Sequence, residues 1–141
     1  MEISEVRKRV HEAMARARQR STDRRARADR ASQAFGAFLE RTAVPLVRQI
    51  ANVLRADGYR FNVSTPAGSV RLASDRAADD FVEVLLDTTG ESPKVVGRTS
   101  RSWGRRVIET DHVIATGDPE TITEEELLTF LLKALEPFVE R

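Results

Sequence analysis

Apolar residues in the first third of the chain recur at the spacing of an α-helix. At about 100° of rotation per residue, they fall within one arc about 100° wide, the width of a stripe that packs against a partner. The stripe contains Ile3, Val6, Val10, Ala13, Met14, Ala17, Ala28, Ala31, Phe35, Leu39, Leu46, Ile50 and Val53. The pattern predicts a long helical segment that ends near Asp57 and Gly58, because glycine adopts the left-handed geometry common just past a helix.

Two features interrupt this apolar stripe. Ser21 and Arg24 lie on the apolar face, and Ser21 begins a Ser-Thr-Asp run of the residue types that favour helix N-caps. Pro45 lacks a backbone donor and disfavours helical geometry at Val44. We therefore expect a long N-terminal helical segment that is either one helix or two, with a break near Ser21 as one alternative and a kink just before Pro45.

From Tyr59 onward the apolar residues occupy alternate positions, which is typical of half-buried strands. Short turns separate the alternating runs, so runs that are consecutive in the sequence are expected to be neighbours in the sheet. The expected strands lie at about 59–64, 70–72, 80–86, 94–100 and 106–115. The run 80–86 is apolar on both faces, which favours a central position. The sequence predicts an antiparallel β-meander of four to five strands.

The end of the chain predicts a C-terminal helix. Thr121 with Glu124, and Thr123 with Glu126, each form a T-x-x-E capping box, and three consecutive glutamates favour the positive end of the helix dipole. Apolar residues then cover most of the circumference, so we expect more than one neighbour to bury this helix. We expect it to pack on one face of the sheet beside part of residues 31–56, which gives an α+β fold.

Composition narrows the class of protein. Of the 141 residues, 40% are hydrophobic and 32% are charged, which suits one domain with a core rather than two. The chain contains no cysteine, so packing rather than disulfides must hold the fold, as is usual in a reducing compartment. No apolar run approaches the roughly 20 residues of a membrane span, and the first residues do not resemble a signal peptide. We expect a cytoplasmic protein that does not bind membranes.

The net charge of +1 hides a strong segregation of charge. Residues 1–30 carry ten Lys or Arg against five Asp or Glu, whereas residues 107–141 carry two against nine. Such segments attract each other within one molecule or between two. We divide the chain into an Arg-rich helical arm, residues 1–30, and a single α+β core domain, residues 31–141.

Small apolar residues of the arm form a narrow seam between two rows of arginine. Coiled-coil helices share this pattern: the seam packs and the flanking charges select the partner. The seam is expected to be Val6, Val10, Ala13, Met14 and Ala17, one row is Arg9, Arg16, Arg20 and Arg27, and the other is Arg7, Arg18 and Arg25. The pattern predicts a non-catalytic module that forms a homo-oligomer or binds an acidic protein partner through this helix.

Nucleic-acid binding is the alternative function. Arginines neutralise phosphates, and an exposed tryptophan stacks on bases. The residues for this alternative are those of the arm from 7 to 30, among them Arg24 and Arg25, and those of an expected hairpin tip, Arg98, Arg101, Trp103, Arg105 and Arg106. Two structural interpretations compete with it: a solvated helix face, and a tryptophan that folds back over its sheet with an arginine on its ring.

No motif in the chain specifies a reaction. His11 and His112 have no metal-ligand spacing around them, and nothing identifies an acid and a base among the carboxylates between residues 79 and 87. We therefore expect no catalytic residues, no metal site and no cofactor. An enzyme is the less favoured interpretation, and it stays open because a site assembled from distant positions leaves no local motif.

Overall fold

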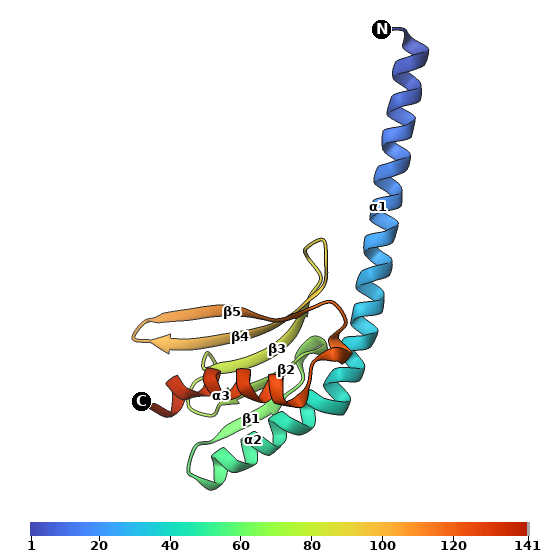
Figure 1. Ribbon diagram of the computed structural model, residues 1–141. Coiled ribbons are helices and arrows are strands. Elements are labelled where there is room, and N and C mark those ends of the chain that lie inside the picture. The colour runs from blue at the N-terminus through green and yellow to red at the C-terminus, as the bar shows by residue number, and fades with distance from the viewer. Residues whose placement is uncertain (141) are drawn as a thin grey trace.

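Two helices joined end to end, a five-stranded antiparallel sheet and a C-terminal helix make up the computed structural model, which describes residues 1–140 (Figure 1). The first two helices are α1 (Ile3–Phe38) and α2 (Val44–Ala56). The remaining elements are β1 (Phe61–Ser64), β2 (Val70–Ser74), β3 (Phe81–Asp87), β4 (Lys94–Trp103), β5 (Arg106–Thr116) and α3 (Glu124–Glu140). The α+β class and the element types expected from the sequence are confirmed.

α1 runs unbroken through Ser21, so the alternative of a second helix that begins there is not observed. The bend comes instead at a π-helical turn, Leu39–Ala43, as expected just before Pro45 (Figure 1). A proline ring clashes with the carbonyl four residues earlier in a regular helix, and here that residue, Arg41, lies in the wider π turn. Pro45 itself lies in the first turn of α2, so its missing N–H falls where the helix changes from π to α geometry.

The strands form a meander in the order β1-β2-β3-β4-β5, with every neighbouring pair antiparallel. β3 lies at the centre, as its two apolar faces predicted. β4 and β5 form a long hairpin closed by Gly104 and Arg105, in which Gly104 has a φ of 62°. Their register shifts between Val95 and Val96, which leaves Ile114 as an extra residue in β5.

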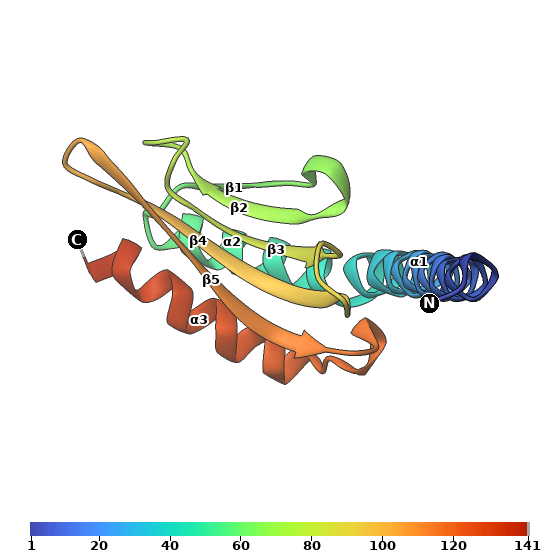
Figure 2. The ribbon, with the colours of Figure 1, turned by 90° about the horizontal axis from the view of Figure 1, so that it is seen from above.

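α2, α3 and the last turns of α1 cover one face of the sheet (Figure 2). The core lies between these layers, and its most deeply buried large side chains include Val47, Leu72, Val82, Leu127 and Leu131. α3 begins with one of the two expected capping boxes: Glu126 N donates to Thr123 Oγ1 at 3.1 Å, and Thr123 Oγ1 donates to Glu126 Oε1 at 3.0 Å. Thr121 instead donates to the carbonyl of Asp118.

The other face of the sheet carries a row of alternating charges. Arg71, Glu83, Arg98 and Asp111 are register partners across β2, β3, β4 and β5. Arg71 donates two hydrogen bonds to the buried Glu83, at 3.0 and 2.7 Å, and Arg98 donates two to Asp111, at 2.9 and 3.1 Å. Each charge faces an opposite charge on the next strand, so the row stabilises this register.

Gly97 on β4 allows α3 to approach the sheet closely. A Cβ atom at this position would lie 2.1 Å from Cζ of Phe130 on α3. The Phe130 ring also stacks on His112 of β5, with 5.7 Å between the ring centroids. The missing side chain of Gly97 therefore provides the space that the Phe130 ring occupies.

The variant Gly97→Ala is expected to lower the free energy of unfolding by about 1–3 kcal/mol, because the added methyl group must displace the Phe130 ring. Urea unfolding measures this loss. In a Phe130→Ala background the same change should cost much less, because the obstructing ring is absent. An equal cost in both backgrounds would contradict the proposed contact.

Candidate interaction surfaces

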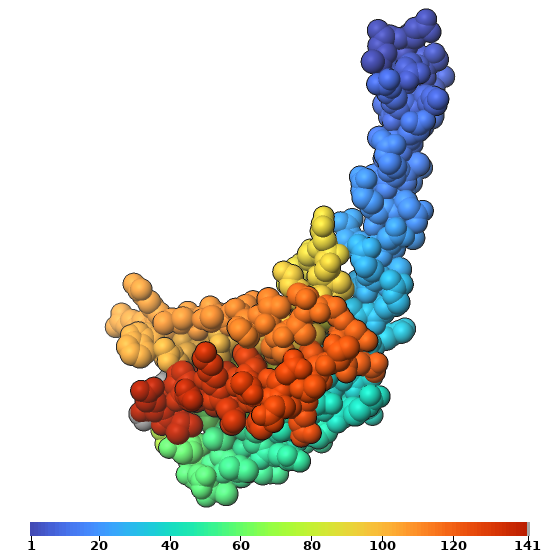
Figure 3. All heavy atoms as spheres, viewed as in Figure 1, coloured from blue at the N-terminus to red at the C-terminus, as the bar shows by residue number. Residues whose placement is uncertain are grey.

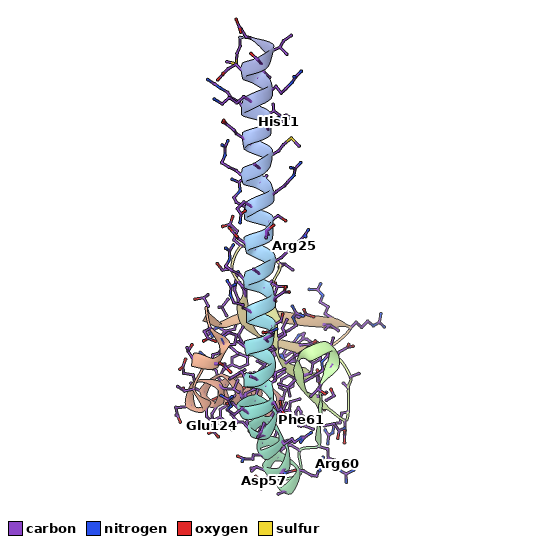
Figure 4. All side chains as sticks on the ribbon, turned by 90° about the vertical axis from the view of Figure 1, so that its right-hand side faces the viewer. His11, Arg25, Asp57, Arg60, Phe61 and Glu124 are labelled. Atoms are coloured by element: carbon purple, nitrogen blue, oxygen red, sulfur yellow. The ribbon has the colours of Figure 1, made fainter. Side chains whose placement is uncertain are left out.

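The arm is a rod that stands away from the body of the molecule (Figures 1 and 3). The first buried residue of α1 is Ala31, and residues 3–30 extend about 42 Å at about 1.5 Å of rise per residue. Figure 4 shows the side chains of the arm, including His11 and Arg25, radiating into open space. Helices gain most of their stability from tertiary packing, so an arm with so little packing in a single chain is suited to bind another molecule.

The seam lies along one side of this rod. Val6, Val10 and Met14 are 44%, 49% and 45% exposed, and Ala13 and Ala17 are also exposed. Because α1 is unbroken, the arginine rows keep the positions expected from the sequence, each about 90° from the middle of the seam. The structure thus brings the predicted interface residues onto one continuous strip, with positive charge along both sides.

The arginines of the arm have few acidic partners within their own chain. Within residues 1–140, the one ion pair that involves the arm joins Arg9 to Glu5 at 3.0 Å, one helical turn away. At the base of the arm, Arg27 donates to the carbonyl of Glu91 at 3.5 Å. Exposed pairs such as Arg9 with Glu5 contribute about 0.2–1 kcal/mol. The acidic C-terminal segment therefore does not neutralise the arm within one chain.

An apolar groove opens between α2 and α3, on the side of both helices that faces solvent. Its volume is about 710 Å³, and it is lined by Ile50, Val53, Leu54, Leu132, Leu135, Glu136, Val139 and Glu140. Val53, Leu132 and Val139 are 63%, 52% and 38% exposed. We refer to these eight residues as the groove.

The groove limits one expectation from the sequence. As expected, more than one neighbour covers α3, because it contacts β3, β5 and the π-helical turn, and its Phe130 packs against Gly97 and His112. Its apolar residues are not buried around the whole circumference, however, because Leu132 and Val139 are exposed beside α2. The signal for the groove was present in the sequence, as more apolar residues on α3 than one buried face requires, and we interpreted it as deeper burial.

The β4–β5 hairpin carries the tryptophan to the end of the sheet opposite the arm (Figures 1 and 2). Trp103 is 64% exposed, and the guanidinium carbon of Arg101 lies 5.5 Å from its ring centroid. Arg106 is its register partner, and Arg105 lies in the turn. An arginine therefore packs on the ring, as one structural interpretation expected, yet the ring does not fold back over the sheet.

Arg98 is bound to acidic side chains of its own sheet. Besides its two bonds to Asp111, its Nε atom lies 3.1 Å from Glu109 Oε1. The hydrogen bonds between the two side chains raise the pKa of Arg98 and lower the pKa of Asp111. Arg98 therefore differs from Arg101, Arg105 and Arg106 at the hairpin tip, because its charge is already paired.

The two arginine-rich features do not form one surface. Arg24 and Arg25 lie on the arm, whereas Trp103 and its neighbouring arginines lie at the far end of the sheet (Figure 1). A single nucleic-acid segment that used both features would have to pass along the body between them. The geometry therefore favours treating the arm and the hairpin tip as separate surfaces.

Two of the side chains considered for catalysis make structural contacts. His112 stacks on Phe130, and the buried Asp80 accepts hydrogen bonds from Ser102 N and Oγ at 2.7 and 2.8 Å. Among residues 1–140, no three His, Asp or Glu side chains are grouped closely enough to hold a metal ion. None of the helices described here has the length and apolar character needed to cross a membrane.

Comparison of this chain with protein-family models, with curated proteins and with solved structures finds no match.

The variant Asp111→Asn is expected to lower the free energy of unfolding by about 0.5–1 kcal/mol at neutral pH, since it removes an exposed ion pair. The folded-state pKa of Asp111 lies below its ordinary value of 3.8. The contribution of the pair is therefore fully present above about pH 4 and is lost as the pH falls through the lowered pKa. Urea unfolding of both proteins across this range should show the difference shrink in acid, and a difference that does not depend on pH would contradict the pairing.

Proposed function

We propose that this protein is a non-catalytic association module whose arm binds another protein chain, either a second copy or an acidic partner. One observation carries the proposal: an exposed apolar seam, flanked by arginine on both sides, runs along a continuous helix that projects from the body. Exposed apolar strips with charged borders are typical of helix–helix interfaces.

The seam is too small for apolar burial alone to give a stable interface. Full burial of a Val or Met side chain contributes about 1.5–3 kcal/mol, and the three large residues of the seam are already about half covered by their own helix. Apolar burial by the seam therefore supplies only a few kcal/mol, about half of the roughly 8 kcal/mol that corresponds to micromolar affinity. Charge pairing by the arginines has to contribute, so the partner surface should be acidic and the association should weaken with salt.

We also propose that the protein acts in the cytoplasm. The absence of cysteine from all 141 residues supports this location, because a reducing compartment gives no benefit from disulfides.

Nucleic-acid binding by the arm is the second candidate. The exposed arginines of the arm favour it, since within residues 1–140 only Arg9 has an acidic partner on the arm. Two observations count against the version that also uses the hairpin: Arg98 is paired with Asp111, and the hairpin tip lies at the opposite end of the body. We therefore place protein association first.

The double variant Val10→Glu with Met14→Glu is expected to convert a self-associated protein to monomer, or to abolish binding of an acidic partner, because it places two carboxylates in the seam. Sedimentation velocity and light scattering measure the change. Ala15→Glu with Gln19→Glu is the matched control: it adds the same charge on the opposite side of the same helix and should leave association intact. Wild-type protein that stays monomeric, and that binds no acidic protein, would contradict the proposal.

Replacement of Arg20, Arg24 and Arg27 by Gln separates the two candidate functions. We expect wild-type protein to bind neither duplex DNA nor single-stranded RNA at about 0.15 M salt, and we expect the triple variant to weaken protein association. Fluorescence anisotropy with labelled oligonucleotides measures the first expectation. Tight binding whose logarithm falls with the logarithm of salt, with a slope reduced in the triple variant, would favour the nucleic-acid candidate instead.

A further inference from the structure

We infer that the arm of one copy docks in the groove of a second copy, with the seam against the apolar floor and arginines beside the acidic rim. This inference rests on the proposed function and names its partner surface. It draws on three properties of the described residues: the dimensions of the two surfaces, their charges and their positions in the fold.

The seam is long enough to fill the groove. At about 1.5 Å of rise per residue, the seam extends about 16.5 Å along α1 from Val6 to Ala17, and the groove extends about 12 Å along α3 from Leu132 to Glu140. Two turns of the arm therefore correspond to the length of the groove. A helix that places its apolar side between two others is a common mode of recognition.

The two surfaces also match in charge. Glu136 and Glu140 line the groove, and no basic side chain of the described chain is among its lining residues. No ion pair joins either glutamate to another residue in the range 1–140. The seam has arginine on both sides, so either orientation of the arm in the groove would bring a guanidinium row toward carboxylates.

Symmetric pairings are less favourable for electrostatic reasons. Two arms packed seam to seam would bring arginine rows against arginine rows, in a parallel or an antiparallel arrangement. Two grooves packed face to face would bring Glu136 and Glu140 against their own copies. A second copy can cover these apolar surfaces in three ways. Of these, only the docking of arm in groove places unlike charges opposite each other.

The groove cannot receive the arm of its own chain. The arm leaves the body at one end of the sheet, and the ends of α2 and α3 that form the groove lie on the far side of the body (Figures 1 and 3). Because α1 is continuous from Ile3 to Phe38, an arm that folded back would have to break this helix. The arm that fills the groove must therefore come from another molecule.

The groove variant Val53→Glu with Leu132→Glu tests this inference in the full chain. Both side chains are more than half exposed, so the fold should persist, which circular dichroism and thermal unfolding check. We expect loss of self-association, and we expect the control Asn52→Glu, an exposed neighbour on α2 outside the groove, to keep it. If the seam variant is monomeric but the groove variant still associates, this inference is wrong and the proposed function stands.

Mixing the two monomeric variants provides a second test that does not depend on the symmetry of the assembly. The groove variant keeps an intact arm, and the seam variant Val10→Glu with Met14→Glu keeps an intact groove. We expect an equimolar mixture to form a 1:1 complex, seen as a doubling of mass in light scattering. A mixture that stays monomeric would overturn docking of arm in groove, because the mixture supplies one intact arm and one intact groove to every pair of unlike chains.

Discussion

Packing of one end of a long helix against a sheet is the interaction on which the rest of this molecule depends. Phe35, Leu39 and Leu46 are buried under the sheet, and the same apolar stripe continues along α1 into the arm, where it meets solvent. Packing of the C-terminal end of α1 sets the direction in which the arm projects from the body. The apolar stripe of the arm would be exposed without support in an isolated peptide, but in the folded protein it has a defined position.

Charge is arranged differently in the body and in the arm. On the open face of the sheet, positive and negative side chains alternate across four strands and neutralise one another locally, from Arg71 to Asp111. On the arm, arginines line both sides of the seam with few acidic neighbours. The local pairs contribute to the register of the sheet, whereas the unbalanced charge of the arm acts at longer range and favours an encounter with an acidic surface.

Much of the architecture could be predicted from the sequence, because the period of apolar residues changes from helix to strand at Tyr59. The central position of β3 and the capping box of Thr123 with Glu126 also followed from local patterns. The pairing of Arg98 with Asp111 did not, since register across a hairpin depends on where the turn closes. The groove was missed for a related reason: an apolar helix indicates how much surface needs cover, but not which side a neighbour leaves open.

The two surfaces that we pair differ in shape and charge, and this difference has a structural consequence. When identical chains associate through two unlike surfaces, the direction of the arm decides the form of the assembly. The assembly closes as a two-fold dimer or a ring if that direction allows it, and otherwise it grows as an open filament. That direction is set by the π-helical turn before Pro45, because it determines the angle between α1 and the groove-forming helix α2. The bend at Leu39–Ala43 is therefore the element that would decide the size of an assembly built in this way.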